Sequence, residues 1–340
     1  MKKKSFIPAG DQAFPAGRGL TEPNMPSKMK QGKYPGYVND FERLLNVQSA
    51  SDCEINMQIY IICYLERLNI PYTLDVFGNI SATKGEANKY ICLCAHIDTV
   101  HDIYRDYKIT LNEGVFYAFA GSHQVGTGGD DKCGVFALLH LLKTSTKPVK
   151  VVFFSREETG CIGSGEFDME VFNDVGLIIG IDRKNKSDLI TCYNDYTISD
   201  HCAEFLLPIA KKYGYRETSG LITDVFTIQG RMNNPVSAIN VSCGYYNPHT
   251  NSEVISLKDF DNCLRFVTSI INKYDNETGY NIEYNYQSGD YTTAERLDWW
   301  LYNNWDRLWE MTCFDAHALY ETENGEIQYD EFADMFYRYF

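Results

Sequence analysis

Residues 90–100 read YICLCAHIDTV, an apolar run that ends in a histidine and an aspartate. Polar and apolar residues do not alternate in the segment YICLCA, which is typical of a strand buried on both faces. Three more such strands are predicted, at 149–155, 176–181 and 236–241. Amphipathic helices are predicted between and after them, at 131–143, 198–212, 224–229 and 257–273. This alternation predicts an α/β fold in which helices cover both faces of a mixed, mostly parallel sheet.

The flanking sequence divides the chain into three parts. Residues 1–36 are rich in Pro, Gly and Lys and have no helical or strand period, so we expect an extended or disordered basic arm. Residues 37–275 begin with helical patterns at 41–45 and 55–68 and continue as one domain. Residues 276–340 open with a polar, turn-rich segment, are acidic and hold all four tryptophans. We expect this part to be a helical extension that packs its apolar stripe on the main domain or on a second copy of the chain.

The composition excludes several classes of function. With a net charge of -15 and a pI ≈ 4.9, we expect no nucleic-acid partner. No apolar run is long enough to cross a bilayer, and the basic N-terminus lacks the apolar stretch of a signal peptide, so we expect no membrane partner. Eleven cysteines are scattered without paired spacing, a pattern that fits free thiols in a reducing compartment. We therefore predict a cytoplasmic protein.

Polar residues suited to metal binding occur at separate points of this framework. They are His96, Asp130, Glu157, Glu158, Asp182 and His249. A two-metal hydrolytic site requires two imidazoles, a bridging carboxylate, two terminal carboxylates and one acid/base that stays off the metal. Most of these residues directly follow apolar strands, which predicts that they line the crevice at the carboxyl ends of the strands. Taken singly, each of them is more often structural than metal-binding, but their conjunction favours a metal site.

The motifs around these residues resemble one known group of enzymes. AHIDTV, GGDDKCG, SREETG and GYYNPHTNSEV resemble the metal and catalytic motifs of the di-zinc exopeptidase clan. This clan contains the tripeptidase T, carboxypeptidase G and aminoacylase group and the related single-domain aminopeptidases. LITDVFTIQGRMNNPVSAI resembles the substrate-pocket segment of the aminopeptidase branches. The resemblance spans roughly residues 38–275 and implies a zinc-exopeptidase-like fold.

The resemblance also implies a set of metal ligands. Asp130 would bridge two divalent ions, with His96 and Asp182 completing one site and Glu158 and His249 the other. Zn²⁺ is the expected ion, and Co²⁺ and Mn²⁺ are alternatives.

Two further residues would have catalytic roles. Glu157 would act as the general base on the bridging water, and Asp98 would orient His96. The peptide bond between Asp130 and Asp131 is a candidate for the cis form, which sites of this group often contain.

The spacing departs from the members that carry a lid domain, since the 66 residues between Asp182 and His249 are largely used by predicted helices and strands. We therefore predict a catalytic domain without a lid. Tyr245 or Tyr246 could then donate a hydrogen bond to the developing oxyanion, but packing is the favoured role of both. Asp224 could receive a substrate amine, support His249 or cap a helix.

Two weaker signals are interpreted as non-functional. Residues 320–332 resemble a calcium-binding loop, but Tyr320 and Thr322 replace expected ligands, so no calcium site is predicted there. The segment GTGGDDKCG lacks the ending of a phosphate-binding loop, and no nucleotide is expected.

Together these features predict a metal-dependent exopeptidase of short peptides, and specifically an aminopeptidase. The alternatives are a carboxypeptidase, an N-acyl amino acid amidohydrolase and a non-catalytic binding protein of the same fold. Association of copies through the C-terminal extension is a further expectation.

Overall fold

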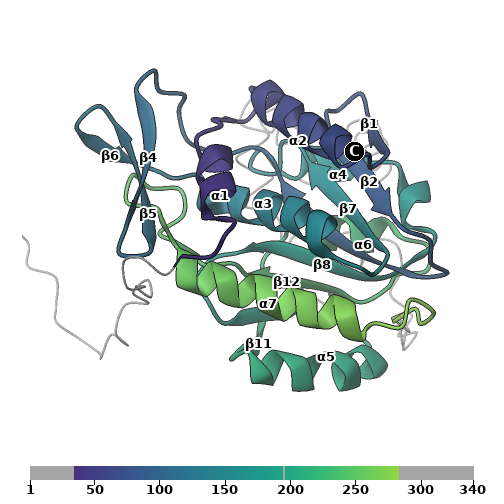
Figure 1. Cartoon of the computed structure of the whole chain (residues 1–340). Coiled ribbons are helices and arrows are strands. Elements are labelled where there is room, and N and C mark those ends of the chain that lie inside the picture. The colour runs from purple at the N-terminus through teal and green to yellow at the C-terminus, as the bar shows by residue number, and fades with distance from the viewer. Residues whose placement is uncertain (1–33, 194–195, 283–340) are drawn as a thin grey trace, which may run out of the picture. The chain divides into compact units, whose positions relative to one another are not determined.

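A nine-stranded mixed sheet forms the centre of the computed structural model, which describes residues 34–193 and 196–282 (Figure 1). Eight of its strands follow one another in the order β1 (Tyr72–Leu74), β2 (Ile80–Lys84), β7 (Val149–Phe154), β3 (Tyr90–His96), β8 (Val175–Arg183), β12 (Ala238–Ser242), β9 (Asp188–Tyr193) and β10 (Tyr196–Thr197). The ninth strand, β11 (Arg216–Ser219), pairs with β9.

The middle of this sheet is parallel. Strand β3 is parallel to both neighbours, with Cys94 opposite Val152 of β7 and opposite Gly180 of β8, and β12 is parallel to β8. Antiparallel pairs are confined to the flanks, where β2 joins β7 and β9 joins β12. The predicted mixed, mostly parallel sheet is confirmed. Because β7, β3 and β8 run in the same direction, their carboxyl ends meet at one edge of the sheet. The polar residues that follow these strands in the sequence therefore start from the same edge.

Helices cover both faces of the sheet, as predicted (Figure 1). Their bounds are α1 (Val38–Leu45), α2 (Ile55–Arg67), α3 (Gly129–Thr144), α4 (Ile162–Glu166), the 3₁₀ helix η1 (Met169–Phe172), α5 (Asp200–Lys212), α6 (Asp224–Arg231) and α7 (Leu257–Lys273).

Strand side chains alternate between two apolar cores. Leu93 of β3 faces the larger core with α1, α2, α3, α5 and α7, whereas Cys94 faces the smaller core with α6 and η1. Both are almost fully buried, as are all seven residues of β3. A strand with two buried faces has no polar side, which explains why its sequence does not alternate.

A second, five-stranded sheet was not predicted. It consists of β4 (Tyr107–Asn112), β5 (Val115–Ala120), β6 (His123–Val125), β13 (Tyr245–Tyr246) and β14 (Val254–Ser256), and its first three strands lie to the left in Figure 1. The interval between His96 and Asp130 therefore holds three strands. Strand β4 is largely exposed and β6 has only three residues, so these two show little apolar pattern, whereas β5 (VFYAFA) is apolar throughout.

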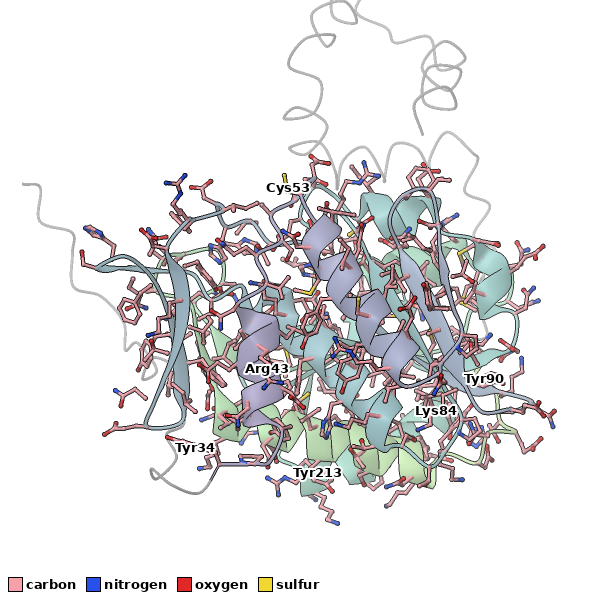
Figure 2. The ribbon with its side chains drawn as sticks, turned by 45° about the horizontal axis from the view of Figure 1, so that its top comes forward. Tyr34, Arg43, Cys53, Lys84, Tyr90 and Tyr213 are labelled. Carbon is pink, nitrogen blue, oxygen red and sulfur yellow. The ribbon has the colours of Figure 1, made fainter. Side chains whose placement is uncertain are left out.

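Several predictions fall outside the described residues and stay predictions. They concern most of the basic arm at 1–36, the tryptophan-rich extension at 276–340 and the calcium-loop resemblance at 320–332. The ten described cysteines are all free, in agreement with the predicted absence of a disulfide framework, and Cys53 is exposed just before α2 (Figure 2). Within the described ranges, no helix has the length and apolar content to cross a membrane.

Helix α3 is anchored at its C-terminal end by a lysine from the sheet. The ammonium group of Lys84 on β2 donates to the carbonyl oxygens of Leu142 and Ser145, both at 2.6 Å (Figure 2). These carbonyls lack partners within the helix, and a cation there also complements the helix dipole. The helix that begins beside Asp130 is thus held against the sheet at its far end.

The aromatic contacts of Phe41 provide a test of the larger core. Its ring stacks on Phe136 at 4.6 Å and lies 4.5 Å from Phe260, so it joins α1 to α3 and α7. We expect Phe41→Ala to lower the free energy of unfolding by about 3–5 kcal/mol, because the cavity cannot close fully. Denaturant unfolding measures this. The control is Ile59→Ala on α2, where the side chain is 53% exposed and the change should stay within about 0.5 kcal/mol.

Candidate metal centre

The candidate ligands come from two strands of the large sheet, from the start of α3 and from two loops. His96 is the last residue of β3, and Asp182 is the penultimate residue of β8. Glu157 and Glu158 lie in the loop after β7, Asp130 is the second residue of α3, and His249 lies in the loop between β13 and β14. As the parallel strands predict, the first four of these positions lie at the same edge of the large sheet.

Two glycines allow the loop before α3 to approach this edge closely. Gly128 has a φ of +64°, and a Cβ there would lie 3.0 Å from the side chains of Thr99 and Lys132. A Cβ on Gly129 would lie 2.7 Å from the Cβ of Tyr245. Side chains other than hydrogen would therefore force the loop away from its neighbours. The peptide bond between Asp130 and Asp131 is cis, as the sequence predicted.

Asp130 lies between the two histidines. Its Oδ1 is 3.1 Å from Nε2 of His96, and its Oδ2 is 3.3 Å from Nε2 of His249. The ring of His96 also approaches Oδ1 of Asp182 at 3.6 Å, and the ring of His249 approaches Oε2 of Glu158 at 3.1 Å. Each imidazole thus faces Asp130 and one further carboxylate, which is the arrangement of two adjacent ligand sets sharing one residue.

These separations fit divalent ions. Ligands about 2.0–2.1 Å from a tetrahedral ion lie about 3.3 Å from one another, close to the four distances given above. Imidazole and carboxylate are ligands that zinc accepts, and His96, Asp130 and Glu158 have ligand atoms within 4.8 Å of one another. Moreover, Oε1 of Glu158 is buried without a hydrogen-bond partner, which is costly unless a cation compensates it. The residues therefore fit the metal pair that the motifs implied.

Asp98 organises the residues around His96. The Nδ1 of His96 lies 3.0 Å from the carbonyl oxygen of Asp98 and 3.3 Å from its Oδ1, so both can accept the Nδ1–H proton. This leaves the Nε2 lone pair directed at Asp130 and Asp182. The carboxylate of Asp98 also accepts the backbone N–H groups of Glu157 at 2.9 Å and Glu158 at 3.2 Å. Asp98 therefore positions two strand ends at once, a wider role than the sequence indicated.

Glu157 lies at the site without contacting the two imidazoles. The only hydrogen bond described for its carboxylate is from the thiol of Cys161, 3.5 Å from Oε1. Burial raises the pKa of Glu157, and the nearby charges of Asp130 and Asp98 reinforce this effect, while His96 opposes it. A carboxyl group that is partly buried beside the ligands and binds protons more tightly than usual is suited to proton transfer.

Burial of several carboxylates together changes the proton affinities of the ligands. Burial opposes the charge on Asp130, but hydrogen bonds with His249 and His96 outweigh it and hold the Asp130 pKa below its ordinary value. Burial and the charge of Asp130 raise the pKa of Asp182 well above its ordinary value, and burial raises the pKa of Glu158 to about 8. The hydrogen bond to Asp130 raises the pKa of His249 to about 9. The cluster thus requires protons or cations for charge balance.

Asp131 is a neighbour that the sequence reasoning did not use. Its ligand atoms also lie near those of His96 and Asp182. However, its two oxygens accept the backbone N–H groups of His96 at 3.2 Å and Gly134 at 2.8 Å. Asp130, by contrast, directs its oxygens at imidazole nitrogens. The geometry therefore favours Asp130 as the shared ligand and a supporting role for Asp131.

The three candidate substrate-binding residues differ in their positions. The hydroxyl of Tyr245 lies 3.4 Å from Oδ1 of Asp182, at the ligand cluster. The hydroxyl of Tyr246 donates instead to Asp259 at 2.8 Å, so the structure does not bring it to the ligands. Asp224 is buried and accepts a hydrogen bond from Ser164 at 2.6 Å. It is the first residue of α6 and not its N-cap, and charges on Glu157 and His96 act on it.

Comparison with protein families gives one match. Residues 76–212 match the model of Peptidase family M28. The matched segment contains His96, Asp130, the glutamate pair and Asp182, and it ends before His249. Among curated protein sequences, none matches the chain.

Several solved structures share the fold. Aminopeptidase PepT from Bacillus cereus superposes with a TM-score of 0.59 and 15% identity, over 69% of this chain and 96% of PepT. A tripeptidase from Staphylococcus aureus gives a TM-score of 0.58 and 15% identity, over 69% of this chain and 96% of its own. The TET1 peptidase of Pyrococcus horikoshii, which can assemble into a tetrahedron or a large octahedral shell, gives a TM-score of 0.53 and 15% identity. The superposition covers 69% of this chain and 99% of TET1.

The family match and the shared fold confirm the resemblance to the di-zinc exopeptidase clan. They support a metal-dependent peptidase, while the roles of individual residues depend on the geometry described above.

Metal binding is expected to tighten as the pH rises from about 6.5 to about 8.5. The His249 pKa of about 9 and the Glu158 pKa of about 8 mean that the metal-free site holds protons in this range. An ion must displace them, since ligation requires neutral imidazole and ionised carboxylate. Each proton released strengthens the apparent affinity by about tenfold per pH unit. Calorimetric titration in two buffers of different ionisation enthalpy measures the metal affinity and the number of protons released. An affinity independent of pH would contradict this ligand assignment.

Proposed function

We propose that this chain is a metal-dependent aminopeptidase that releases single residues from short peptides. The observation that carries the proposal is the position of Asp130 between two imidazoles, each of which also faces a further carboxylate. Glu157, partly buried beside them and without a contact to either imidazole, would supply the acid/base that such a ligand set alone lacks.

The protein residues would divide the two ions between them. Asp130 would be shared, with His96 and Asp182 on one side and Glu158 and His249 on the other. When bound, two divalent ions would polarise the scissile carbonyl and lower the pKa of the attacking water molecule. Asp98 keeps the His96 ring in the tautomer whose Nε2 is free to ligate.

Glu157 would move the proton. As the water oxygen bonds to the carbonyl carbon, the Glu157 carboxylate accepts a proton from the water. As the carbon–nitrogen bond breaks, the same proton passes to the leaving amine, and Glu157 is ionised again. The raised pKa of Glu157 suits it to hold a proton between these two steps. Tyr245, whose hydroxyl is at the cluster, is the candidate donor to the developing oxyanion.

The charge of the site favours a substrate with a free amine. Among the described residues, the ion pairs of the ligand carboxylates are all with His96 or His249. Asp224 adds a buried carboxyl group whose described hydrogen bond comes from the neutral hydroxyl of Ser164. Two bound dications would offset the charge of the ligand carboxylates, but Asp224 is not a ligand. An ionised Asp224 would attract an ammonium group and repel a carboxylate, which favours amino-terminal attack over carboxy-terminal attack.

Replacement of the proposed base tests the mechanism. We expect Glu157→Gln to lower kcat by about 10²–10⁴-fold, because an amide cannot accept the proton. Metal stoichiometry should stay at the wild-type value, since Glu157 contacts neither imidazole. Glu166→Gln on α4 is the matched control, because Glu166 is exposed and outside the site. Steady-state kinetics and metal analysis of the same samples provide the readout. Full activity of Glu157→Gln would exclude the proposed role.

A panel of substrates distinguishes an aminopeptidase from a deacylase. We expect metal-loaded protein to release the first residue from di- and tripeptides with a free amine, and to lose this activity when a chelator removes the ions. N-acetylated versions of the same peptides should not be cleaved, and Asp224→Asn should raise KM for the free-amine peptides. Chromatography of the products gives the cleavage rates of the free-amine peptides and of the acetylated peptides. Cleavage of the acetylated series alone would favour the amidohydrolase alternative.

A further inference from the structure

Glu253 is a fully buried carboxylate that lies close to the candidate site and is not one of its ligands. It follows His249 by four residues, immediately before β14, and has no exposed surface. A buried carboxylate is costly unless hydrogen bonds satisfy its oxygens, so the groups around it show what it holds in place.

Those groups belong mainly to the loop that delivers Asp130. The backbone N–H of Asp130 donates to Oε1 of Glu253 at 3.1 Å. The other oxygen, Oε2, accepts from the backbone N–H of Gly128 at 2.6 Å and from the hydroxyl of Thr127 at 3.2 Å. The ring Nε2 of His101 lies 2.9 Å from the same oxygen. Three donors from four consecutive residues therefore converge on one side chain that is distant in sequence.

The start of α3 requires such a partner. The first N–H groups of a helix have no acceptor within the helix, and the N-cap residue Gly128 has no side chain to supply one. Glu253 takes the place of the missing cap, and its carboxylate also complements the positive end of the helix. Oε2 of Glu253 accepts hydrogen bonds from both Thr127 and Gly128, so it holds the two residues that precede α3.

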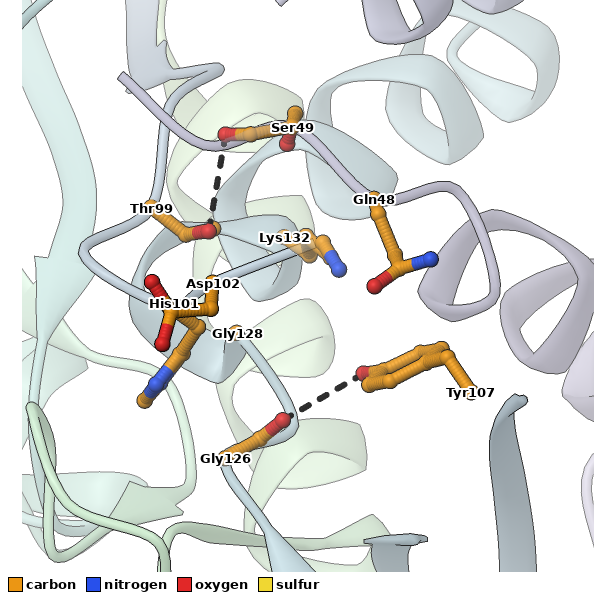
Figure 3. Close-up of a pocket in the computed structure, with 9 residues that line it drawn as sticks. All are labelled: Gln48, Ser49, Thr99, His101, Asp102, Tyr107, Gly126, Gly128 and Lys132. Atoms are coloured by element: carbon orange, nitrogen blue, oxygen red, sulfur yellow. Dashed lines mark hydrogen bonds between the residues drawn. The ribbon is translucent and has the colours of Figure 1, made fainter. Parts of the chain in front are cut away.

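The surroundings keep this loop in one position. Figure 3 shows His101, Gly126, Gly128 and Lys132 around a small recess next to it. A Cβ on Gly126 would lie 2.0 Å from the His101 ring, so the ring packs directly on the loop. The ammonium group of Lys132 donates to the carbonyl oxygen of Leu45 at 3.2 Å and lies 5.4 Å from the centre of the Tyr107 ring. Two basic side chains therefore border the region of the buried carboxylate.

Glu253 also belongs to the segment that carries His249. Within it, the Glu253 backbone N–H donates to the carbonyl oxygen of Thr250 at 3.1 Å, and the Thr250 hydroxyl donates to Asn247 at 2.8 Å. Because this segment is internally braced, a contact at Glu253 constrains His249. One side chain thus joins the segments of two candidate ligands, whose nearest atoms are 3.3 Å apart.

We infer that Glu253 is a positioning residue that sets the spacing of Asp130 and His249 for metal binding. The inference rests on the proposed function, since it assigns both residues to the metal pair. Neither the resemblance nor the ligand motifs assign a role to this glutamate.

Glu253→Gln tests the inference with little change in shape. An amide retains one acceptor oxygen and places an NH₂ group opposite N–H donors, so either Asp130 or the donors at Oε2 lose their acceptor. In the metal-free protein, we expect hydrogen exchange at the amides of Gly128 and Asp130 to accelerate at least about tenfold, with amides of α7 unchanged. Zn²⁺ affinity, measured by calorimetry, should fall by about 10–100-fold.

Asp275→Asn is the matched control. Asp275 also accepts two backbone N–H groups, from Glu277 and Thr278, both at 2.9 Å. The next residue, Asn276, bonds to Lys89 at the start of β3, so this turn lies at the opposite end of the strand from His96. The same chemical change there should leave zinc affinity at the wild-type value.

The outcomes separate the two hypotheses. Unchanged exchange at Gly128 and Asp130 in Glu253→Gln, or wild-type zinc affinity together with a lower Tm, would overturn the positioning role. Wild-type protein that binds no divalent ion would instead contradict the proposed function, whatever the exchange shows. If Glu253→Gln does not fold, Glu253→Asp retains both oxygens one methylene further away, and its zinc affinity should again fall below that of the wild type and of Asp275→Asn.

Discussion

Electrostatic repulsion among buried carboxylates is the constraint on which the rest of this molecule depends. Asp98, Asp130, Glu158 and Asp182 meet at one edge of the sheet, where Asp98 is fully buried and the side chains of the other three are 7–13% exposed. Such a group is stable only if each oxygen has a hydrogen-bond donor or a cation. Asp98 meets this condition through backbone N–H groups, whereas Glu158 does not within the protein alone. The proposed metal binding is therefore supported by the charge of the site as well as by the motifs.

The central sheet illustrates what a sequence reveals. Apolar runs such as 90–95 are long, uniform and bounded by polar residues, and a strand buried on both faces has no other composition available. The direction of the strands follows from the helices between them. Together these two facts place His96 and Asp182 at the same edge before any contact is known. The structure brings the two side chains within 3.6 Å of each other.

The second sheet and Glu253 illustrate what the sequence does not reveal. Strands β13 and β14 contain only two and three residues, too few to show a period, and they are defined by pairing with residues far away in the chain. Glu253 has no local signal either, because its partners at 127–130 are more than a hundred residues away. Tyr246 was misleading for a related reason: it neighbours Tyr245, but adjacent strand residues point to opposite faces.

The pairing of β14 with β5 has a consequence for the stage of synthesis at which the candidate site can form. Ile255 lies opposite Phe116, so this contact closes a segment of nearly 140 residues. Closure of so long a segment costs conformational entropy that only late contacts repay. During synthesis, His96, Asp130 and Asp182 emerge well before His249. A nascent or prematurely terminated chain therefore contains four of the five candidate ligands but lacks His249, and the candidate site is complete only when nearly the whole domain has been synthesised.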